Sequence, residues 1–162
     1  MLARLALAMG RPFSIAAAAT FNASPAKVFA VAEDLARWNE WSPFFRMEAG
    51  VTSEVSTPSS GVGAYYTWSG KRTGRGRMEV LETTPGERVV LNLEFIEPFN
   101  AVNRTVFTLT PTASGGTHFR WEMSGERPLL MVVVAALMRL DNKLADDFVA
   151  GLGLLRGIVD GA

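Results

Sequence analysis

Thr117-His-Phe-Arg-Trp-Glu-Met123 is a segment in which apolar and polar side chains alternate. Successive side chains of a β-strand point to opposite faces of its sheet, so this segment has one apolar and one polar face. The same alternation occurs in Ala64-Tyr-Tyr-Thr-Trp68, in Val89-Val-Leu-Asn-Leu-Glu-Phe95 and in Thr105-Val-Phe-Thr-Leu109. Strands with one polar face are typical of an antiparallel sheet, which is therefore predicted here.

Turn residues separate these strands between Gly61 and Gly125. Glycine, proline and serine, which favour tight hairpins, occur in Gly70-Lys-Arg-Thr-Gly74, in Thr84-Pro-Gly86 and in Ser114-Gly-Gly116. A first strand is expected earlier in the chain, from Phe13 to Phe21.

Beyond Pro128, apolar residues recur every three or four positions instead of every second one. They form a single stripe that consists of Leu130, Val133, Leu137, Leu140, Leu144, Phe148, Leu152, Leu155 and Val159. This period predicts one long helix that reaches the C-terminus and places an apolar face against the sheet. A sheet with one helix to cover it must wrap around that helix, and such an arrangement leaves a pocket between the two.

Two short helices are expected after the first strand. Ser24-Pro25 supplies a side-chain cap and a proline at the first helical position. A second helical segment contains Trp38 and Trp41, which share one face, and Pro43 ends it. The two tryptophans are expected either to close one end of the core or to form the rim of the pocket.

The composition limits the function classes. The 162 residues suffice for one domain, with residues 1–12 expected as a leader and residues 13–162 as the domain. Sixteen basic and sixteen acidic residues cancel, which disfavours a nucleic-acid partner. Arg11-Pro12 interrupts the apolar N-terminal run well before the ~20 residues of a membrane span, so no span is expected. The absence of cysteine fits a cytoplasmic location.

Few residues could carry chemistry. His118, the only histidine, falls on the polar face of its strand, where a solvated residue is expected. No set of metal ligands converges in the sequence, and neither a metal nor another cofactor is expected. Lys71, Arg72, Arg75 and Arg77 are expected to be a solvated hairpin tip, with an anion site as the alternative.

The ordered set of segments resembles the bacterial polyketide cyclase/dehydrase-like branch of the START/Bet v 1-like (SRPBCC) superfamily, over about residues 13 to 159. The matching segments are Ser24-Pro25-Ala26-Lys27-Val28-Phe29, Arg37-Trp38 to Trp41-Ser42-Pro43, Tyr66-x-Trp68-x-Gly70, Gly74-x-Gly76-x-Met78, Pro85-x-Glu87-x-Val89, Phe95-x-x-Pro98-Phe99, Gly116-Thr117 with Trp121 and Gly125, and Phe148-x-x-Gly151-Leu152-x-x-Leu155. No single one is specific, but their order is. The resemblance implies an α+β helix-grip fold, in which a seven-stranded antiparallel sheet wraps around a long C-terminal helix, with two short helices after strand 1. It also implies an apolar cavity of the kind that the superfamily uses for lipids, sterols, hormones and polyketides.

A ligand in that cavity is expected to contact inward-facing residues of the strands and of the helix. The predicted residues are Trp41, Tyr66, Trp68, Met78, Leu93, Phe95, Phe107, Trp121, Met123, Leu144, Phe148 and Gly151. Gly151 either leaves room for the ligand or permits close packing of the helix on the sheet. Tyr66 is the one inward side chain with a readily transferred proton, but a phenol with a pKa near 10 is better suited to orienting a ligand than to acid–base catalysis.

Three functions are consistent with these features. The favoured one is the binding or carriage of a small hydrophobic molecule. The second is a cyclase or dehydratase acting on a polyketide-like substrate, with Tyr66 as the orienting or acid group. The third is a protein-interaction module, for instance a homodimer, that uses the continuously apolar segment from Leu129 to Met138.

Overall fold

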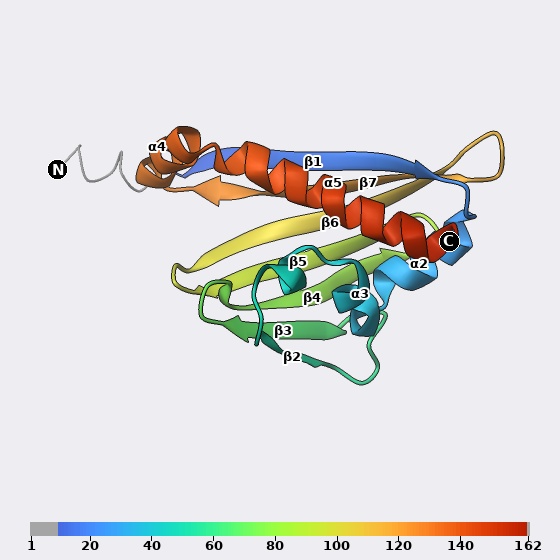
Figure 1. Cartoon of the computed structure of the whole chain (residues 1–162), viewed down its shortest axis with the longest axis horizontal. Coiled ribbons are helices and arrows are strands. Elements are labelled where there is room, and N and C mark those ends of the chain that lie inside the picture. The colour runs from blue at the N-terminus through green and yellow to red at the C-terminus, as the bar shows by residue number, and fades with distance from the viewer. Residues whose placement is uncertain (1–9, 162) are drawn as a thin grey trace.

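The computed structural model describes residues 10–161, and these form an α+β fold with seven strands in one antiparallel sheet (Figure 1). The strands are β1 (Arg11–Phe21), β2 (Thr52–Val55), β3 (Tyr65–Gly70), β4 (Gly74–Thr84), β5 (Arg88–Glu97), β6 (Ala101–Pro111) and β7 (Thr117–Arg127). Their order is β1-β7-β6-β5-β4-β3-β2, so the sheet is open, with β1 and β2 at its edges. The predicted helix-grip fold is confirmed.

The alternation of side chains along the strands is also confirmed. In β7, Phe119, Trp121 and Met123 are buried, whereas His118 and Arg120 are exposed. Strand β2 is the one strand that was not predicted from the sequence. It is four residues long and exposed throughout, so it carries no apolar alternation from which a strand could be read.

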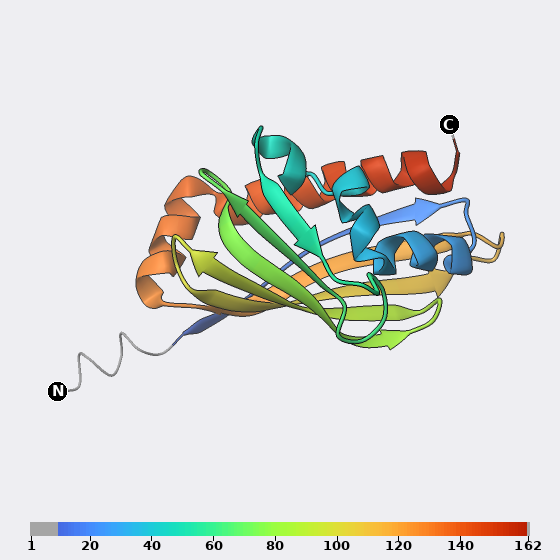
Figure 2. The same cartoon turned by 90° about the horizontal axis from the view of Figure 1, so that it is seen from below.

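The chain between β1 and β2 contains α2 (Pro25–Glu33), the 3₁₀ turn η1 (Leu35–Arg37), α3 (Trp38–Trp41) and a second 3₁₀ turn, η2 (Phe44–Met47). Ser24 Oγ accepts a hydrogen bond from the N–H of Lys27, as expected of an N-cap. Figure 2 shows α2, α3 and η2 on the same side of the curved sheet as the C-terminal helix. This side of the sheet holds the hydrophobic core.

The prediction of a single C-terminal helix was wrong in one respect, because this part of the chain forms two helices. These are α4 (Leu129–Met138) and α5 (Leu140–Val159), and between them Arg139 adopts a left-handed conformation with φ 51° and ψ 39°. The longest strands have 11 residues and span about 36 Å, whereas 20 helical residues span about 30 Å. A straight helix from Leu129 to Val159 would span about 46 Å and overhang the sheet.

The predicted apolar stripe is therefore divided. Its second half lies on α5, where Phe148, Leu152, Leu155 and Val159 are buried. Its first half lies on α4, where Leu130 is 69% exposed and Leu137 is 80% exposed. The prediction that this first half packs on the sheet was wrong.

Strand β1 begins at Arg11, two residues before the expected start, and Met1 to Met9 of the expected leader lie outside the described residues. Among residues 10–161, no helix combines the length and the apolar character needed to cross a membrane.

Candidate functional site

A cavity of about 320 Å³ lies between the sheet, the α3–η2 segment and α5. Its lining is mostly apolar and comes from five neighbouring strands and the β3–β4 turn, from α5, and from α3 and the chain that follows it up to β2. The lining residues are Trp38, Ser42, Phe44, Phe45, Met47, Val51, Tyr66, Trp68, Arg72, Thr73, Met78, Leu93, Phe95, Thr105, Trp121, Met123, Leu144 and Phe148. The pocket expected between sheet and helix is thus present.

Nine of the twelve residues predicted to contact a ligand line this cavity. They are Tyr66, Trp68, Met78, Leu93, Phe95, Trp121, Met123, Leu144 and Phe148. Strand parity brings the first seven to the same face, and the helical stripe brings the last two opposite them. Their contact with a ligand stays a prediction.

The other three, Trp41, Phe107 and Gly151, do not line it. Trp41 and Phe107 are fully buried behind Trp121, with ring centroids 5.5 Å and 5.7 Å from it. A Cβ on Gly151 would lie 3.0 Å from Trp121 Cζ3 and 3.0 Å from Pro43 Cδ. Gly151 therefore permits close packing of α5 on the sheet, which was the second of the two alternatives for this residue.

Several lining residues were not predicted. Ser42, Phe44, Phe45, Met47 and Val51 follow α3 in an irregular segment and form one wall of the cavity. Such a segment has no period from which an inward face can be derived. The available signal was the apolar pair Phe44-Phe45, which directly follows Pro43. Trp38 also lines the cavity, so of the two tryptophans it is the one at the pocket.

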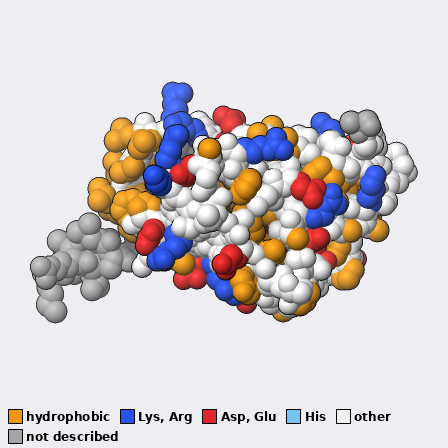
Figure 3. All heavy atoms as spheres, turned by 60° about the horizontal axis from the view of Figure 1, so that its bottom comes forward, with side chains coloured by type: hydrophobic (Ala, Val, Ile, Leu, Met, Phe, Trp, Pro, Cys, Tyr) orange, Lys and Arg blue, Asp and Glu red, His pale blue; other side chains and the backbone are white. Residues whose placement is uncertain are grey.

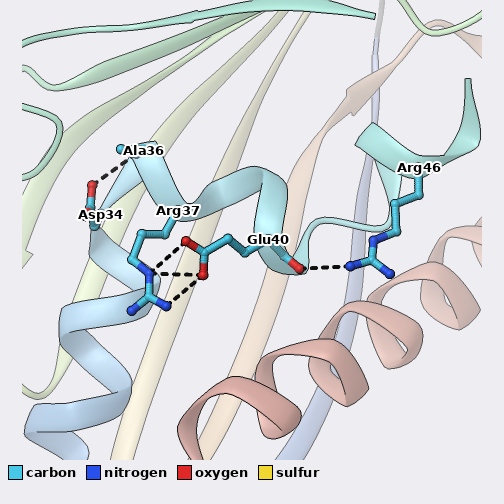
Figure 4. Close-up of polar contacts among 5 residues, drawn as sticks. All are labelled: Asp34, Ala36, Arg37, Glu40 and Arg46. Carbon is cyan, nitrogen blue, oxygen red and sulfur yellow. Dashed lines mark hydrogen bonds and ion pairs between the residues drawn. The ribbon is translucent and has the colours of Figure 1, made fainter. Parts of the chain in front are cut away.

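Polar contacts hold this irregular wall in place. Arg37 forms an ion pair with Glu40, with 2.7 Å between Nη2 and Oε2, and Arg46 donates to the backbone carbonyl of Glu40 at 3.2 Å (Figure 4). Asp34 accepts a hydrogen bond from the N–H of Ala36 and so caps η1. Since the Arg37–Glu40 pair is solvent-exposed, we expect it to contribute more to geometry than to stability.

Glu48 links the end of that wall to the β3–β4 turn. Its carboxylate accepts hydrogen bonds from the backbone N–H groups of Lys71, Arg72 and Thr73, at 2.8, 2.9 and 2.9 Å, and from Thr73 Oγ1 at 3.1 Å. These bonds, that of the Thr73 N–H foremost, lower the pKa of Glu48 to about 2. The turn thus binds an anion through its backbone, but the anion is a side chain of the protein itself. Arg72 and Thr73, which line the cavity, are positioned by this contact.

Tyr66 lines the cavity with a hydroxyl that is already engaged. It donates a hydrogen bond to Asn39 Oδ1 at 2.7 Å. Burial raises the pKa of Tyr66 above its ordinary value of 10, against hydrogen bonds with Ser53 and Asn39 that lower it. A phenol that has a raised pKa and already donates its proton in a hydrogen bond is poorly suited to proton transfer near neutral pH.

The rest of the lining offers little for catalysis. Arg72 is its only other titratable side chain. His118 is exposed on the outer face of the sheet, 3.3 Å from Thr20 Oγ1. Within residues 10–161, no three side chains of the kinds that bind metals lie close enough to hold an ion. The lining thus offers packing contacts with apolar and aromatic side chains and a few hydroxyl groups.

Comparison with solved structures shows the same fold in other proteins. Protein MLL2253 from Mesorhizobium loti is 21% identical, with a TM-score of 0.67, and the match covers 91% of this chain and 97% of that one. DynU16, a protein of the dynemicin biosynthetic locus, is 17% identical with a TM-score of 0.63, covering 91% of this chain and 47% of its own. The Aha1 dimer from Colwellia psychrerythraea is 14% identical with a TM-score of 0.60, covering 92% and 97%.

No curated protein matches the chain significantly. A family model, described as polyketide cyclase / dehydrase and lipid transport, matches residues 12–155, which include all seven strands except for Arg11 of β1, and most of α5. The fold, the pocket between sheet and helix, and this match agree with the resemblance of the sequence segments. The chain therefore belongs to the polyketide cyclase/dehydrase and lipid transport family.

Proposed function

We propose that this protein binds a small hydrophobic molecule in the cavity between the sheet and α5 and carries it. The observation that supports this best is the lining, which is mostly apolar and aromatic and contains no side chain suited to acid–base catalysis near neutral pH. The family description includes lipid transport, which is consistent with carriage.

The size of the cavity limits the affinity. At about 320 Å³, it lies at the small end of the usual range for ligand pockets, roughly 300–1,000 Å³. Burying roughly 300 Å² of apolar ligand surface at about 25 cal/mol/Å² gives about 7 to 8 kcal/mol. Lost translational and rotational freedom removes at least about 4 kcal/mol, which leaves roughly millimolar binding. A physiological ligand therefore needs a polar contact in addition to its apolar surface.

Titration with N-phenyl-1-naphthylamine tests the proposal, because the emission of this neutral probe rises in an apolar site. We expect saturable binding to the wild type and little binding to Leu93→Trp, whose larger side chain would fill the cavity. Leu81→Trp on the adjacent strand β4 is the matched control, because Leu81 is 44% exposed and does not line this cavity. Equal binding by a folded Leu93→Trp variant would show that the probe binds elsewhere.

An enzyme of the cyclase or dehydratase type is less well supported. The family description names these activities, and the similar DynU16 comes from a biosynthetic locus. The residue available for the chemistry is Tyr66, but its proton is already donated to Asn39. Substrate turnover that is lost in Tyr66→Phe, with ligand binding retained, would favour the enzyme over the carrier.

A second candidate function is self-association through α4. This helix has no charged residue from Leu129 to Met138, and Leu130, Val133, Leu137 and Met138 are all more than half exposed. Figure 3 shows hydrophobic side chains gathered at the end of the molecule that carries α4. Because the whole helix is uncharged, its complement must be equally apolar, and the same helix of a second copy meets that requirement.

A further inference from the structure

We infer that the rim of the cavity mouth docks on an anionic lipid surface, where apolar side chains insert among the lipids and basic side chains contact the headgroups. This docking goes beyond the proposed function, because it names the surface at which the cavity would open. It does not depend on which ligand the cavity holds. The rim consists of three connecting segments, which are residues 44–51, residues 71–73 of the β3–β4 turn and residues 98–100 of the β5–β6 turn.

The exposed lining residues show where the cavity opens. Of the residues that line it, only Met47 and Arg72 are exposed, and the others are buried or half-buried. Met47 ends η2 and Arg72 lies in the β3–β4 turn, so the mouth lies between these two segments. Figures 1 and 2 show the β3–β4 and β5–β6 turns at the same end of the sheet, the end from which α5 starts.

The three segments are in contact with one another. The Glu48 carboxylate accepts hydrogen bonds from the backbone N–H groups of residues 71–73, which joins the first segment to the β3–β4 turn. At the end of that turn, a Cβ on Gly74 would lie 3.2 Å from Pro98 Cδ, so the β3–β4 turn also touches the β5–β6 turn. The segments therefore form one continuous rim.

Two large apolar side chains of the rim are exposed. Phe99, in the β5–β6 turn, is 70% exposed, and Met47 is 51% exposed. Side chains of this size gain free energy when they move from water into an apolar medium. The exposed apolar residues of α4, assigned above to self-association, are not part of the rim.

The rim also carries a net positive charge. Its basic side chains are Arg46, Lys71 and Arg72, and its one acidic side chain is Glu48. The Glu48 carboxylate is already held by backbone N–H groups of the β3–β4 turn. Lys71 and Arg72 form no ion pair with any residue from 10 to 161, so both charges remain for a partner.

This combination of side chains favours a lipid surface as the partner. Anionic headgroups attract the basic side chains, each of which raises the affinity about fivefold, and the hydrocarbon below accepts Phe99 and Met47. A bilayer also holds the kind of molecule that fits the cavity, because an apolar compound partitions out of water. A carrier whose mouth opens on that surface would exchange its ligand without passing it through water.

Flotation with lipid vesicles tests the docking, with the full chain and no added ligand. We expect the protein to float with vesicles of equal parts phosphatidylglycerol and phosphatidylcholine. Vesicles of phosphatidylcholine alone should bind it about 25-fold more weakly, the effect of two net charges. Binding to the anionic vesicles should also weaken between about 0.1 M and about 1 M salt, where the Debye length falls from about 10 Å to about 3 Å.

Two double variants test the charges. Lys71→Ala with Arg72→Ala should lower the affinity for anionic vesicles about 25-fold. Lys27→Ala with Arg88→Ala is the matched control, because it removes the same charge from two exposed residues outside the rim. Arg88 begins β5, at the end of β4 that lies away from the β3–β4 turn, and Lys27 lies on α2, which Figure 1 shows at the opposite end of the molecule. The control should bind as the wild type does.

Two single variants test the insertion. Phe99→Ser should lower the affinity by about 10-fold or more, because a serine gains nothing in hydrocarbon. Val62→Ser is the matched control, since Val62 is 68% exposed and precedes β3, whereas the β3–β4 turn follows it. All the substituted side chains are exposed, so each variant should keep the melting temperature of the wild type.

The outcomes separate the docking from the carrier function. A protein that does not float with anionic vesicles would overturn the docking, while the carrier function, tested with N-phenyl-1-naphthylamine in solution, would stand. Flotation that both rim variants retain would also overturn it, and its loss in Val133→Glu would then assign the contact to α4. Equal losses in the rim variants and in their controls would overturn it as well. Flotation that follows the rim, in a protein that binds no probe, would support the docking and contradict the carrier.

Discussion

Trp121 is the residue at which the core and the cavity meet. Its ring centroid lies 5.6 Å from that of Trp38, 5.5 Å from that of Trp41 and 5.7 Å from that of Phe107, while its other face stacks on Phe148. The Trp121 ring can lie close to the backbone of α5 because Gly151 has no side chain. The absence of one Cβ atom at position 151 therefore sets how closely α5 approaches the sheet.

Two glycines of α5 provide a matched test of this packing. Gly151→Leu should lower the free energy of unfolding by about 1 to 3 kcal/mol, because its side chain would overlap Trp121 and Pro43. Gly153→Leu should leave stability unchanged or raise it by up to about 1 kcal/mol, since a Cβ there meets nothing within 4 Å and leucine has the higher helix propensity. Urea unfolding measures both. Equal effects would show that α5 does not pack closely at Gly151.

Glu48 predicts a pH dependence at the same scale. Folding lowers the pKa of its carboxyl from 4.5 to about 2, so the stabilisation from its hydrogen bonds is complete above pH 4.5 and is lost as the pH falls toward 2. The melting temperature of the wild type should exceed that of Glu48→Gln by a constant amount above about pH 5.5. The difference should shrink between pH 4.5 and 2. A difference that stays the same through this range would contradict the contact with the β3–β4 turn.

At the scale of elements, the main feature is the break between α4 and α5. Arg139 closes α4, where its N–H bonds to the carbonyls of Ala135 and Ala136, and α5 then starts along the sheet. Arg127, just before α4, bonds to Asp141 in the first turn of α5 and lies 3.8 Å from the centre of the Phe13 ring. These contacts hold both ends of α4 while leaving its apolar side chains exposed.

Self-association through α4 can be tested with one charge. Val133→Glu should convert a dimer to a monomer in light scattering after gel filtration, because it places a charge in an apolar interface. Val149→Glu on α5 should leave the dimer intact, although Val149, at 60% exposure, is as accessible as Val133, at 51%. A wild-type protein that stays monomeric at high micromolar concentration would contradict this second function.

For the whole molecule, the sheet curves around α5 (Figure 2). The cavity lies between α5, the α3–η2 segment and strands β3 to β7. The lining comes from segments that are far apart in the chain, from Trp38 to Phe148. A ligand in this cavity would therefore contact the sheet and α5 at once, and binding should stabilise the fold as one unit.

Ligand-linked stability gives the corresponding prediction. N-phenyl-1-naphthylamine at 100 times its dissociation constant should add about 2.7 kcal/mol to the free energy of unfolding. For a chain of this size, the melting temperature should rise by about 5 to 10 °C. Leu93→Trp should remove most of the rise, and Leu81→Trp should keep it. Scanning calorimetry of all three proteins measures this, and a rise that survives in Leu93→Trp would place the probe outside the cavity.

The sequence by itself determined the features that follow from local periodicity. Alternation along the strands placed Tyr66, Trp68, Phe95, Trp121 and Met123 on the inner face, and all five line the cavity. The helical stripe likewise placed Leu144 and Phe148 opposite them. These predictions succeeded because the direction of a side chain in a regular strand or helix depends only on its position in that element.

The tertiary structure decided what depends on length and on distant neighbours. The break at Arg139 and the exposure of α4 follow from the length of the helix relative to the sheet, which no local pattern contains. The close packing at Gly151 depends on Trp121, a residue thirty positions away. The wall that carries Ser42 is irregular, so only its hydrogen bonds and its contacts with the sheet and α5 bring that serine to the cavity. Long-range contacts of this kind are made by the folded chain as a whole, and for that reason its sequence periods did not reveal them.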